Sequence, residues 1–251
     1  MAKQKGIIKL KGTIGDISFY KTIDGHLARE KGGVDATRIK NDPNFQRTRE
    51  NGQEFGHAGS AGKLLRTAFR IFLQNASDTR MVSRLTKDMM AVIKADATST
   101  RGQRNVLDGE LEMLEGFEFN IDGKLTECMY APYTATINRV SGEARIVAPT
   151  FEPSTRIAYP VGATHLKFVA GGAEIDFENG TFHLVNSETG HFAIAPGSTA
   201  NVDLNNVLTP NSTKPIFLIF GIEFFQDVNG QRYPLKNGLY NPLALVKVSG
   251  L

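Results

Sequence analysis

The sequence of 251 residues contains a single cysteine, Cys128. This excludes an intramolecular disulfide and a metal cluster held by several thiolates. The chain also lacks any apolar run near the roughly 20 residues that a transmembrane helix requires. Its first residues, MAKQKGIIKLKG, lack the apolar stretch of a signal peptide. We therefore expect no membrane span and synthesis in the cytoplasm, with any release from the cell by lysis or a dedicated machine, including release as part of a particle.

Acidic residues are the minority in the first half of the chain, and basic residues are the minority in the second half. Residues 1–108 hold 20 Lys and Arg against 11 Asp and Glu, a net charge of +9. Residues 109–251 hold 9 against 15, a net charge of −6. A basic front half and an acidic back half indicate either nucleic-acid contact or attraction between neighbouring copies of the chain.

Residues 1–34 predict a β-ribbon of three strands, because turn signals at Gly15-Asp16 and Asp24-Gly25 separate short β-prone runs. A two-residue turn at Gly15-Asp16 pairs Ile14 with Ile17, and we expect this ladder to continue back to residue 8. The register sorts the apolar side chains onto one face: Ile8, Leu10, Ile14, Ile17, Phe19 and Ile23. Such a ribbon is marginal alone. Its face is covered either by the protein's own helices or by another copy, and we favour another copy.

Residues 35–106 predict a helical region. Asp42 caps its first helix, with Pro43 at the first helical position. Four glycines interrupt the apolar periodicity that follows, and each costs a helix about 1 kcal/mol relative to alanine. We therefore expect two helices, roughly 43–55 and 59–75, and a third over about 79–95. The inward side of the third helix is predicted to hold Met81, Val82, Leu85, Met89 and Ile93.

Residues 107–251 consist of short β-prone runs separated by Gly, Asn, Pro and Ser. Hairpin turns are indicated by RVSGEARI, DFENGTF and DVNGQRY. Strands at this spacing without intervening helices predict an antiparallel β-sandwich, jelly-roll or immunoglobulin-like. The expected fold class is α+β, with boundaries after residues 34 and 106.

Two stretches resemble known nucleotide-binding or catalytic motifs, but neither matches its motif fully. GHAGSAGKLL resembles a phosphate-binding P-loop, but five residues instead of four separate Gly56 from Gly62, and Leu64 replaces the required hydroxyl residue. Ser60 lacks the first glycine of a G-x-S-x-G nucleophile elbow. The histidines show no H-x-H or H-E-x-x-H spacing. We expect a protein that is not an enzyme and that has no cofactor and no metal.

Basic residues form a candidate contact face for nucleic acid. Lys63, Arg66 and Arg70 are spaced i, i+3 and i+7 on one helix face, and Arg80 and Arg84 follow. Such a face neutralises phosphates. The sequence contains no helix-turn-helix, zinc-finger, RRM or KH signature to accompany it.

The stretches KGTIGDISFYKTIDGHLAREKGG and DPNFQRTRENGQEFGHAGSAGKLLRTAF, within roughly the first 75 residues, resemble a group of uncharacterised proteins. These proteins come from Bacteroidota and their mobile elements, including phage-associated ones. They begin with a G-x-[IV]-G-x-x-x-[FY] ribbon, followed by a helical region and a β-rich tail. The group carries no assigned activity, so the resemblance transfers no catalytic residue. It implies a phage-like or assembly role.

Together these observations predict a non-enzymatic structural protein that self-assembles into a phage-like particle, tube or filament. Its partners would be copies of itself, joined through the N-terminal ribbon and the charge-asymmetric halves. Two alternatives stay open. One is a binding module that presents sandwich loops to carbohydrate or protein, and the other is a nucleic-acid-binding protein that uses the basic helices.

Overall fold

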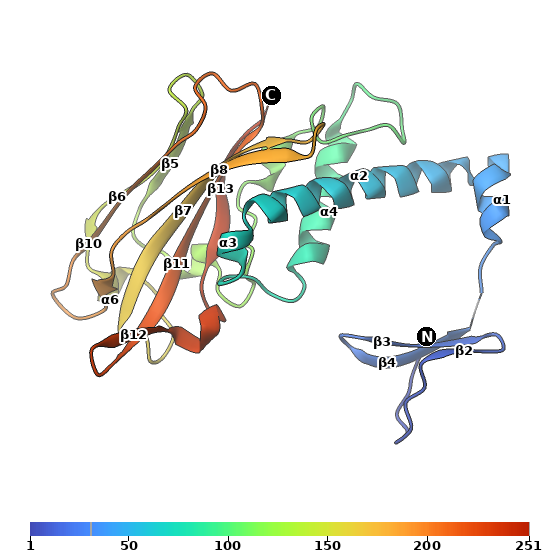
Figure 1. The fold of residues 1–251 in the computed structure, drawn as a ribbon, viewed down its shortest axis with the longest axis horizontal. Coiled ribbons are helices and arrows are strands. Elements are labelled where there is room, and N and C mark those ends of the chain that lie inside the picture. The colour runs from blue at the N-terminus through green and yellow to red at the C-terminus, as the bar shows by residue number, and fades with distance from the viewer. Residues whose placement is uncertain (31, 251) are drawn as a thin grey trace. The chain divides into compact units, whose positions relative to one another are not determined.

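The computed structural model describes residues 1–30 and 32–250. The chain forms two compact units, Met1–Arg49 and Glu50–Leu251, where we expected three parts. The fold combines helices with antiparallel sheets (Figure 1), which confirms the expected mixture of helix and antiparallel strand.

The N-terminal unit contains a four-stranded antiparallel sheet of order β1-β4-β3-β2. Its strands are β1 (Ala2–Lys3), β2 (Gly12–Ile14), β3 (Ile17–Thr22) and β4 (Gly25–Glu30). Helix α1 (Ala36–Asn41) and a 3-10 turn, η1 (Pro43–Phe45), follow. Asp35 and Asp42 cap them, each accepting hydrogen bonds from backbone N–H groups of the next turn.

The first predicted turn is confirmed. Ile14 pairs with Ile17, and Gly15 has φ 55°, as the first residue of a type II′ turn requires. The ladder stops at β2, however, so Ile8 and Leu10 lie outside it. The backbone N–H of Leu10 instead donates to Gln4 Oε1 at 2.9 Å.

The second predicted turn is displaced by one residue. Thr22 pairs with Gly25, so the turn residues are Ile23 and Asp24 instead of Asp24 and Gly25. Gly25, with φ 112°, closes the turn in a conformation that suits glycine. Ile23 is consequently 74% exposed at the tip of the hairpin and does not join the apolar face.

The helical part runs differently from the prediction. Helix α2 (Gln46–Ala68) passes through all four glycines without a break, and α3 (Arg70–Leu73) and α4 (Met81–Ala95) follow. The expected gap near residues 55–59 is therefore wrong. Among the described residues, no helix is long and apolar enough to span a membrane.

Two sets of contacts keep α2 continuous despite its low helix propensity. On its core side, Ala58, Ala61 and Leu65 are buried, and Gly62 packs against Leu85 of α4. Earlier in the helix, the loop 101–104 holds α2 through polar contacts, which we call the α2 clamp: Arg101 with Glu50 and Asn51, Gly102 N–H with Glu54, and Arg104 C=O with His57. Burial and the clamp outweigh the propensity cost of the glycines.

Helix α4 confirms most of its predicted inner face. Met81, Leu85, Met89 and Ile93 are buried. Val82 is exposed and Val92 is buried in its place. The buried stripe therefore follows the i, i+4 rhythm from residue 81, which puts residue 82 outside it.

Two further antiparallel sheets belong to Glu50–Leu251. The three-stranded sheet, of order β10-β6-β5, contains β5 (Thr134–Asn138), β6 (Glu143–Phe151) and β10 (Ala200–Val207). The six-stranded sheet contains β7 (His165–Asp176), β8 (Thr181–Glu188), β9 (Phe192–Ala193), β11 (Ile216–Val228), β12 (Gln231–Pro234) and β13 (Leu243–Ser249). Short helical turns complete the unit: η2 (Leu111–Leu114), α5 (Leu125–Cys128), α6 (Pro153–Arg156) and η3 (Leu235–Gly238).

The central strands of the six-stranded sheet are buried on both faces. In β11, Phe217 and Ile219 join a hydrophobic cluster with α2 and α4, whereas Leu218 and Phe220 join a second cluster with the three-stranded sheet. Figure 1 shows the helices and the three-stranded sheet on opposite sides of β7 and β11. Burial on both faces explains why IFLIFGIEFF is almost wholly apolar instead of alternating.

Replacing an exposed glycine and a buried glycine by alanine should change the stability of the protein in opposite directions. In Gly56→Ala, the new Cβ meets no described atom within 4 Å, so helix propensity should stabilise the protein by about 1 kcal/mol. In Gly171→Ala, the Cβ would stand 2.7 Å from the Phe72 ring, so overpacking should destabilise by about 1–3 kcal/mol. Thermal unfolding followed by circular dichroism should show a raised Tm for the first variant and a lowered Tm for the second. A lowered Tm for Gly56→Ala would contradict this account of α2.

Candidate functional site

The sheet of the N-terminal unit has an apolar face without a core. Ile14, Ile17, Phe19 and Ala28 share this face by register, and we call them the apolar face. Ile14 is 62% and Ile17 is 45% exposed, and no described residue of Met1–Arg49 is buried. Of the six residues predicted for the assembly surface, the register therefore brings together Ile14, Ile17 and Phe19.

The opposite side of the same sheet is mostly polar. Thr13 lies across from Ser18, and Tyr20 lies beside Arg29, whose guanidinium carbon is 5.6 Å from the ring centroid. By the same register, Lys21, His26 and Glu30 share the side of Ile17 and Phe19, and Leu27 lies on the side of Tyr20. The apolar face is therefore limited to the part of the sheet around Ile14, Ile17 and Phe19.

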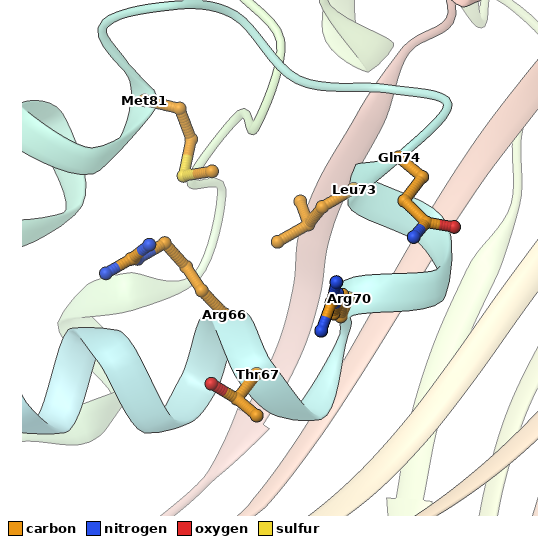
Figure 2. Close-up of a pocket in the computed structure, with 6 residues that line it drawn as sticks. All are labelled: Arg66, Thr67, Arg70, Leu73, Gln74 and Met81. Atoms are coloured by element: carbon orange, nitrogen blue, oxygen red, sulfur yellow. The ribbon is translucent and has the colours of Figure 1, made fainter.

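The basic residues predicted to share one face are divided between different surroundings. Arg66 on α2 and Arg70 at the start of α3 line a hollow of about 300 Å³ with Leu73 and Met81. In Figure 2 the Arg66 side chain extends from α2 toward Met81. Lys63 lines a separate groove. The side chains of Lys63, Arg66 and Arg70 form no hydrogen bond or ion pair with any described residue.

Arg84 differs from the prediction because it points inward. Its guanidinium forms an ion pair with Asp78, donates to the Glu118 backbone oxygen at 2.6 Å, and lies 5.1 Å from the Phe117 ring centroid. Arg84 is therefore a structural residue and not part of an exposed phosphate-binding face. Arg80 is exposed at the start of α4, and its backbone N–H donates to Asp78 Oδ1 at 2.6 Å.

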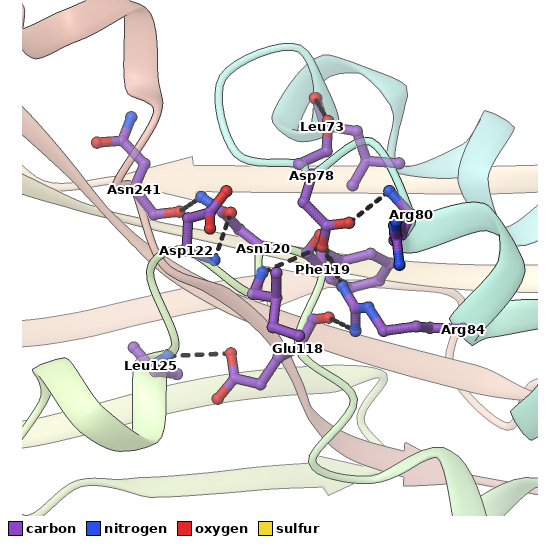
Figure 3. A network of polar contacts seen from close by, with 12 residues as sticks. Leu73, Asp78, Arg80, Arg84, Glu118, Phe119, Asn120, Asp122, Leu125 and Asn241 are labelled. Atoms are coloured by element: carbon purple, nitrogen blue, oxygen red, sulfur yellow. Dashed lines mark hydrogen bonds and ion pairs between the residues drawn. The ribbon is translucent and has the colours of Figure 1, made fainter. Parts of the chain in front are cut away.

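Asp78 is the centre of a polar network (Figure 3). Its carboxylate accepts hydrogen bonds from Arg84 and from the backbone N–H groups of Arg80 and Ile121, and its side chain is only 4% exposed. Burial alone would raise the pKa of Asp78. The hydrogen bonds outweigh burial and hold this pKa below its usual range.

Two asparagines extend this network. Asn120 Nδ2 donates to the backbone oxygens of Leu239 and Asn241 at 2.9 and 3.0 Å. Asn241 accepts from Phe224 N–H at 3.0 Å and donates to the Asn75 oxygen at 3.1 Å. Through Asp78 the network binds the turn before α4 to Ile121, and Asn120 continues it to Asn241. We interpret it as a structural joint.

Asp78→Asn should destabilise the protein at neutral pH by about 1–3 kcal/mol, because it removes the negative charge that pairs with Arg84 and replaces one of the two acceptor oxygens of a buried network by a donor. The folded-state pKa of Asp78 is lowered, so its contribution is complete above the unfolded pKa of about 3.9 and disappears as pH falls through the folded value. Denaturant unfolding should therefore show wild type and variant converging in acid. Asp203→Asn breaks an exposed carboxylate pair with Arg145 and is the control, with an expected loss of about 0–1 kcal/mol. Equal losses in both variants would contradict the joint.

A groove of about 1100 Å³ lies within Glu50–Leu251. Its walls are α2, the loop 105–108 and the turn between β7 and β8, with apolar contributions from Leu64, Leu107 and Phe177. Polar residues also line it: His57, Ser60, Lys63, Thr67, Asn105, Asp108 and Glu178. We call this hollow the α2 groove.

Sequence reasoning missed the α2 groove, although the stretch that resembles a P-loop supplies much of one wall. His57, Ser60, Lys63 and Leu64 all come from GHAGSAGKLL. This stretch is continuous helix, so its interior N–H groups are occupied by helical hydrogen bonds and do not form a phosphate cradle. The other walls come from residues at least 40 positions further along the chain, which no local motif reveals.

Cys128 is the single thiol of the chain. Burial, followed by the charges of Glu118 and Glu127, raises the pKa of the Cys128 thiol to about 11, which keeps it in the unreactive neutral form at neutral pH. Within residues 1–30 and 32–250, no three His, Cys, Asp or Glu side chains are grouped to hold a metal ion.

Comparisons of the chain with protein-family models, curated proteins and solved structures find no match.

Proposed function

We propose that the protein is a non-enzymatic structural subunit that self-assembles into a phage-like particle, tube or filament through its N-terminal unit. The observation that carries this proposal is a four-stranded sheet without a single buried residue in the described part of Met1–Arg49. Short strands gain stability when an apolar face is covered. Ile14 and Ile17 present such a face, and a second copy is the partner we assign to it.

Charge supports attraction between copies. Residues 1–49 hold 11 Lys and Arg against 5 Asp and Glu, a net charge of +6. Residues 50–251 hold 18 against 21, a net charge of −3. The N-terminal unit of one copy is thus complementary in charge to the larger unit of another, and this attraction weakens as salt screens it.

The architecture of the larger unit agrees with a structural role. We further propose that its two sheets form a β-sandwich of jelly-roll or immunoglobulin-like type, as a shared hydrophobic cluster between them suggests. Jelly rolls form the shells of many virus particles. The resemblance of the first 75 residues to phage-associated proteins points in the same direction.

Ile14→Asn/Ile17→Asn should prevent assembly because it makes the apolar face polar. Thr13→Asn/Ser18→Asn is the matched control, since these residues form the adjacent cross-strand pair on the opposite side. Size-exclusion chromatography with light scattering at low salt and high concentration should show large species for wild type and control, and the 27.5 kDa monomer for the test variant. Negative-stain microscopy would show the form of the assembly. Monomeric wild type at high concentration and low salt would rule the proposal out.

Polyanion binding is a second candidate, favoured by the unpartnered side chains of Lys63, Arg66 and Arg70 on neighbouring turns. A phosphate backbone supplies the counter-charge that these groups lack within the chain. Arg84 is excluded from this surface by its ion pair with Asp78.

Arg66→Ala/Arg70→Ala should weaken binding to duplex DNA and lower the slope of log affinity against log salt by about 2, one for each lost phosphate contact. Lys87→Ala/Lys94→Ala removes the same charge from exposed positions on α4 and should change the slope less. A salt series of gel-shift assays measures both. An equal effect of the two variants would indicate a response to net charge alone, and no binding by wild type would reject the candidate.

A further inference from the structure

A closed loop before β2 displays two isoleucines. Gln4 fastens its base: the side-chain Nε2 donates to Leu10 O at 3.3 Å and to Leu27 O at 3.0 Å, and Oε1 accepts from Leu10 N–H at 2.9 Å. Ile7 is fully exposed and Ile8 is 79% exposed between these fixed ends. Lys5 and Lys11 flank them in sequence. We call residues 4–11 the Ile loop.

The α2 groove has the complementary chemistry. Leu64, Leu107 and Phe177 supply partly exposed apolar surface. Asp108 and Glu178 are exposed in its lining, and neither forms an ion pair with a described residue. Two carboxylates against Lys63 leave the lining net negative when His57 is neutral. At about 1100 Å³, the groove is as large as the upper range of small-molecule pockets, roughly 1,000 Å³, and admits a short peptide segment.

We propose that the Ile loop of one copy docks in the α2 groove of a second copy. Ile7 and Ile8 would cover the apolar wall, while Lys5 and Lys11 would pair with Asp108 and Glu178. This inference rests on the proposed self-assembly and names the surface that receives the Ile loop, a contact separate from the one made by the apolar face. It explains the exposure of two adjacent isoleucines in a loop whose base is fixed by hydrogen bonds.

This docking has a consequence for the form of the assembly. The two surfaces come from different parts of the chain, so two copies can exchange loops reciprocally as a symmetric dimer, or each copy can offer its loop to one neighbour and its groove to another, which is a heterologous contact. Repetition of such a contact produces rings where the rotation closes, and open filaments where it does not.

Cysteine cross-linking tests which surfaces meet. In a Cys128→Ser background, a copy with Ile8→Cys is mixed with a differently tagged copy carrying Leu107→Cys. Mild oxidation should produce a disulfide-linked heterodimer, because a disulfide requires Cβ atoms within about 4.5 Å. Val161→Cys, at a highly exposed position of the larger unit, replaces Leu107→Cys in the control and should produce little heterodimer.

Charge reversal tests the same contact without cysteines. Asp108→Lys/Glu178→Lys should raise the concentration needed for assembly about tenfold or more, because like charges then meet. Adding Lys5→Glu/Lys11→Glu to that variant should restore assembly. The circular dichroism spectrum of each variant shows whether the fold is retained.

The outcomes of these experiments distinguish failure of the docking inference from failure of the proposed assembly. Assembly of wild type without the Ile8–Leu107 cross-link, or without charge-reversal rescue, overturns the docking inference and leaves the proposed assembly standing. A monomeric wild type rejects the assembly itself. A cross-link formed within a single copy carrying both cysteines, with none between copies, would place the loop in its own groove and also overturn the inference.

Discussion

Strand β11 is buried on both sides, and the order of Glu50–Leu251 depends on that burial. Alternate residues of the strand face opposite clusters, Phe217 toward the helices and Leu218 toward the three-stranded sheet. Helices α2 and α4 on one side, and the three-stranded sheet on the other, bury apolar side chains against this strand. The close fit is visible at Gly171 of the neighbouring strand β7, where the Phe72 ring occupies the space that a side chain would need. The helices and the three-stranded sheet therefore pack on opposite faces of the same strand.

The N-terminal sheet obeys the same alternation but lacks the opposing layer. The register places Ile14, Ile17 and Phe19 on one side, yet the described residues of Met1–Arg49 include none that is buried. An ordered apolar face without an interior is characteristic of an interaction surface. The contrast between the two units, one self-sufficient and one not, is the physical basis for proposing that copies of the chain complete each other.

Sequence patterns predicted correctly those parts of the fold that depend on neighbouring residues in the chain. Period-two alternation and Gly15 gave the first hairpin register correctly, and helical periodicity gave most of the inner face of α4. The predicted break in α2 was wrong, since propensity carries no information about the burial of Leu65 or about the α2 clamp. Arg84 was misplaced for a similar reason: its partners include the backbone of residues 118–119, which are distant in sequence. The α2 groove likewise depends on three separate segments.

The α2 clamp begins where the larger unit begins. Its first contact is at Glu50, whereas the helix starts at Gln46, so the first turn belongs to the N-terminal unit. That turn has polar partners of its own, because the Arg49 guanidinium donates to the backbone oxygens of Ile39 and Asp42 at 2.8 and 2.9 Å. The boundary between the units therefore falls inside one continuous helix whose two parts are held by different sets of polar partners.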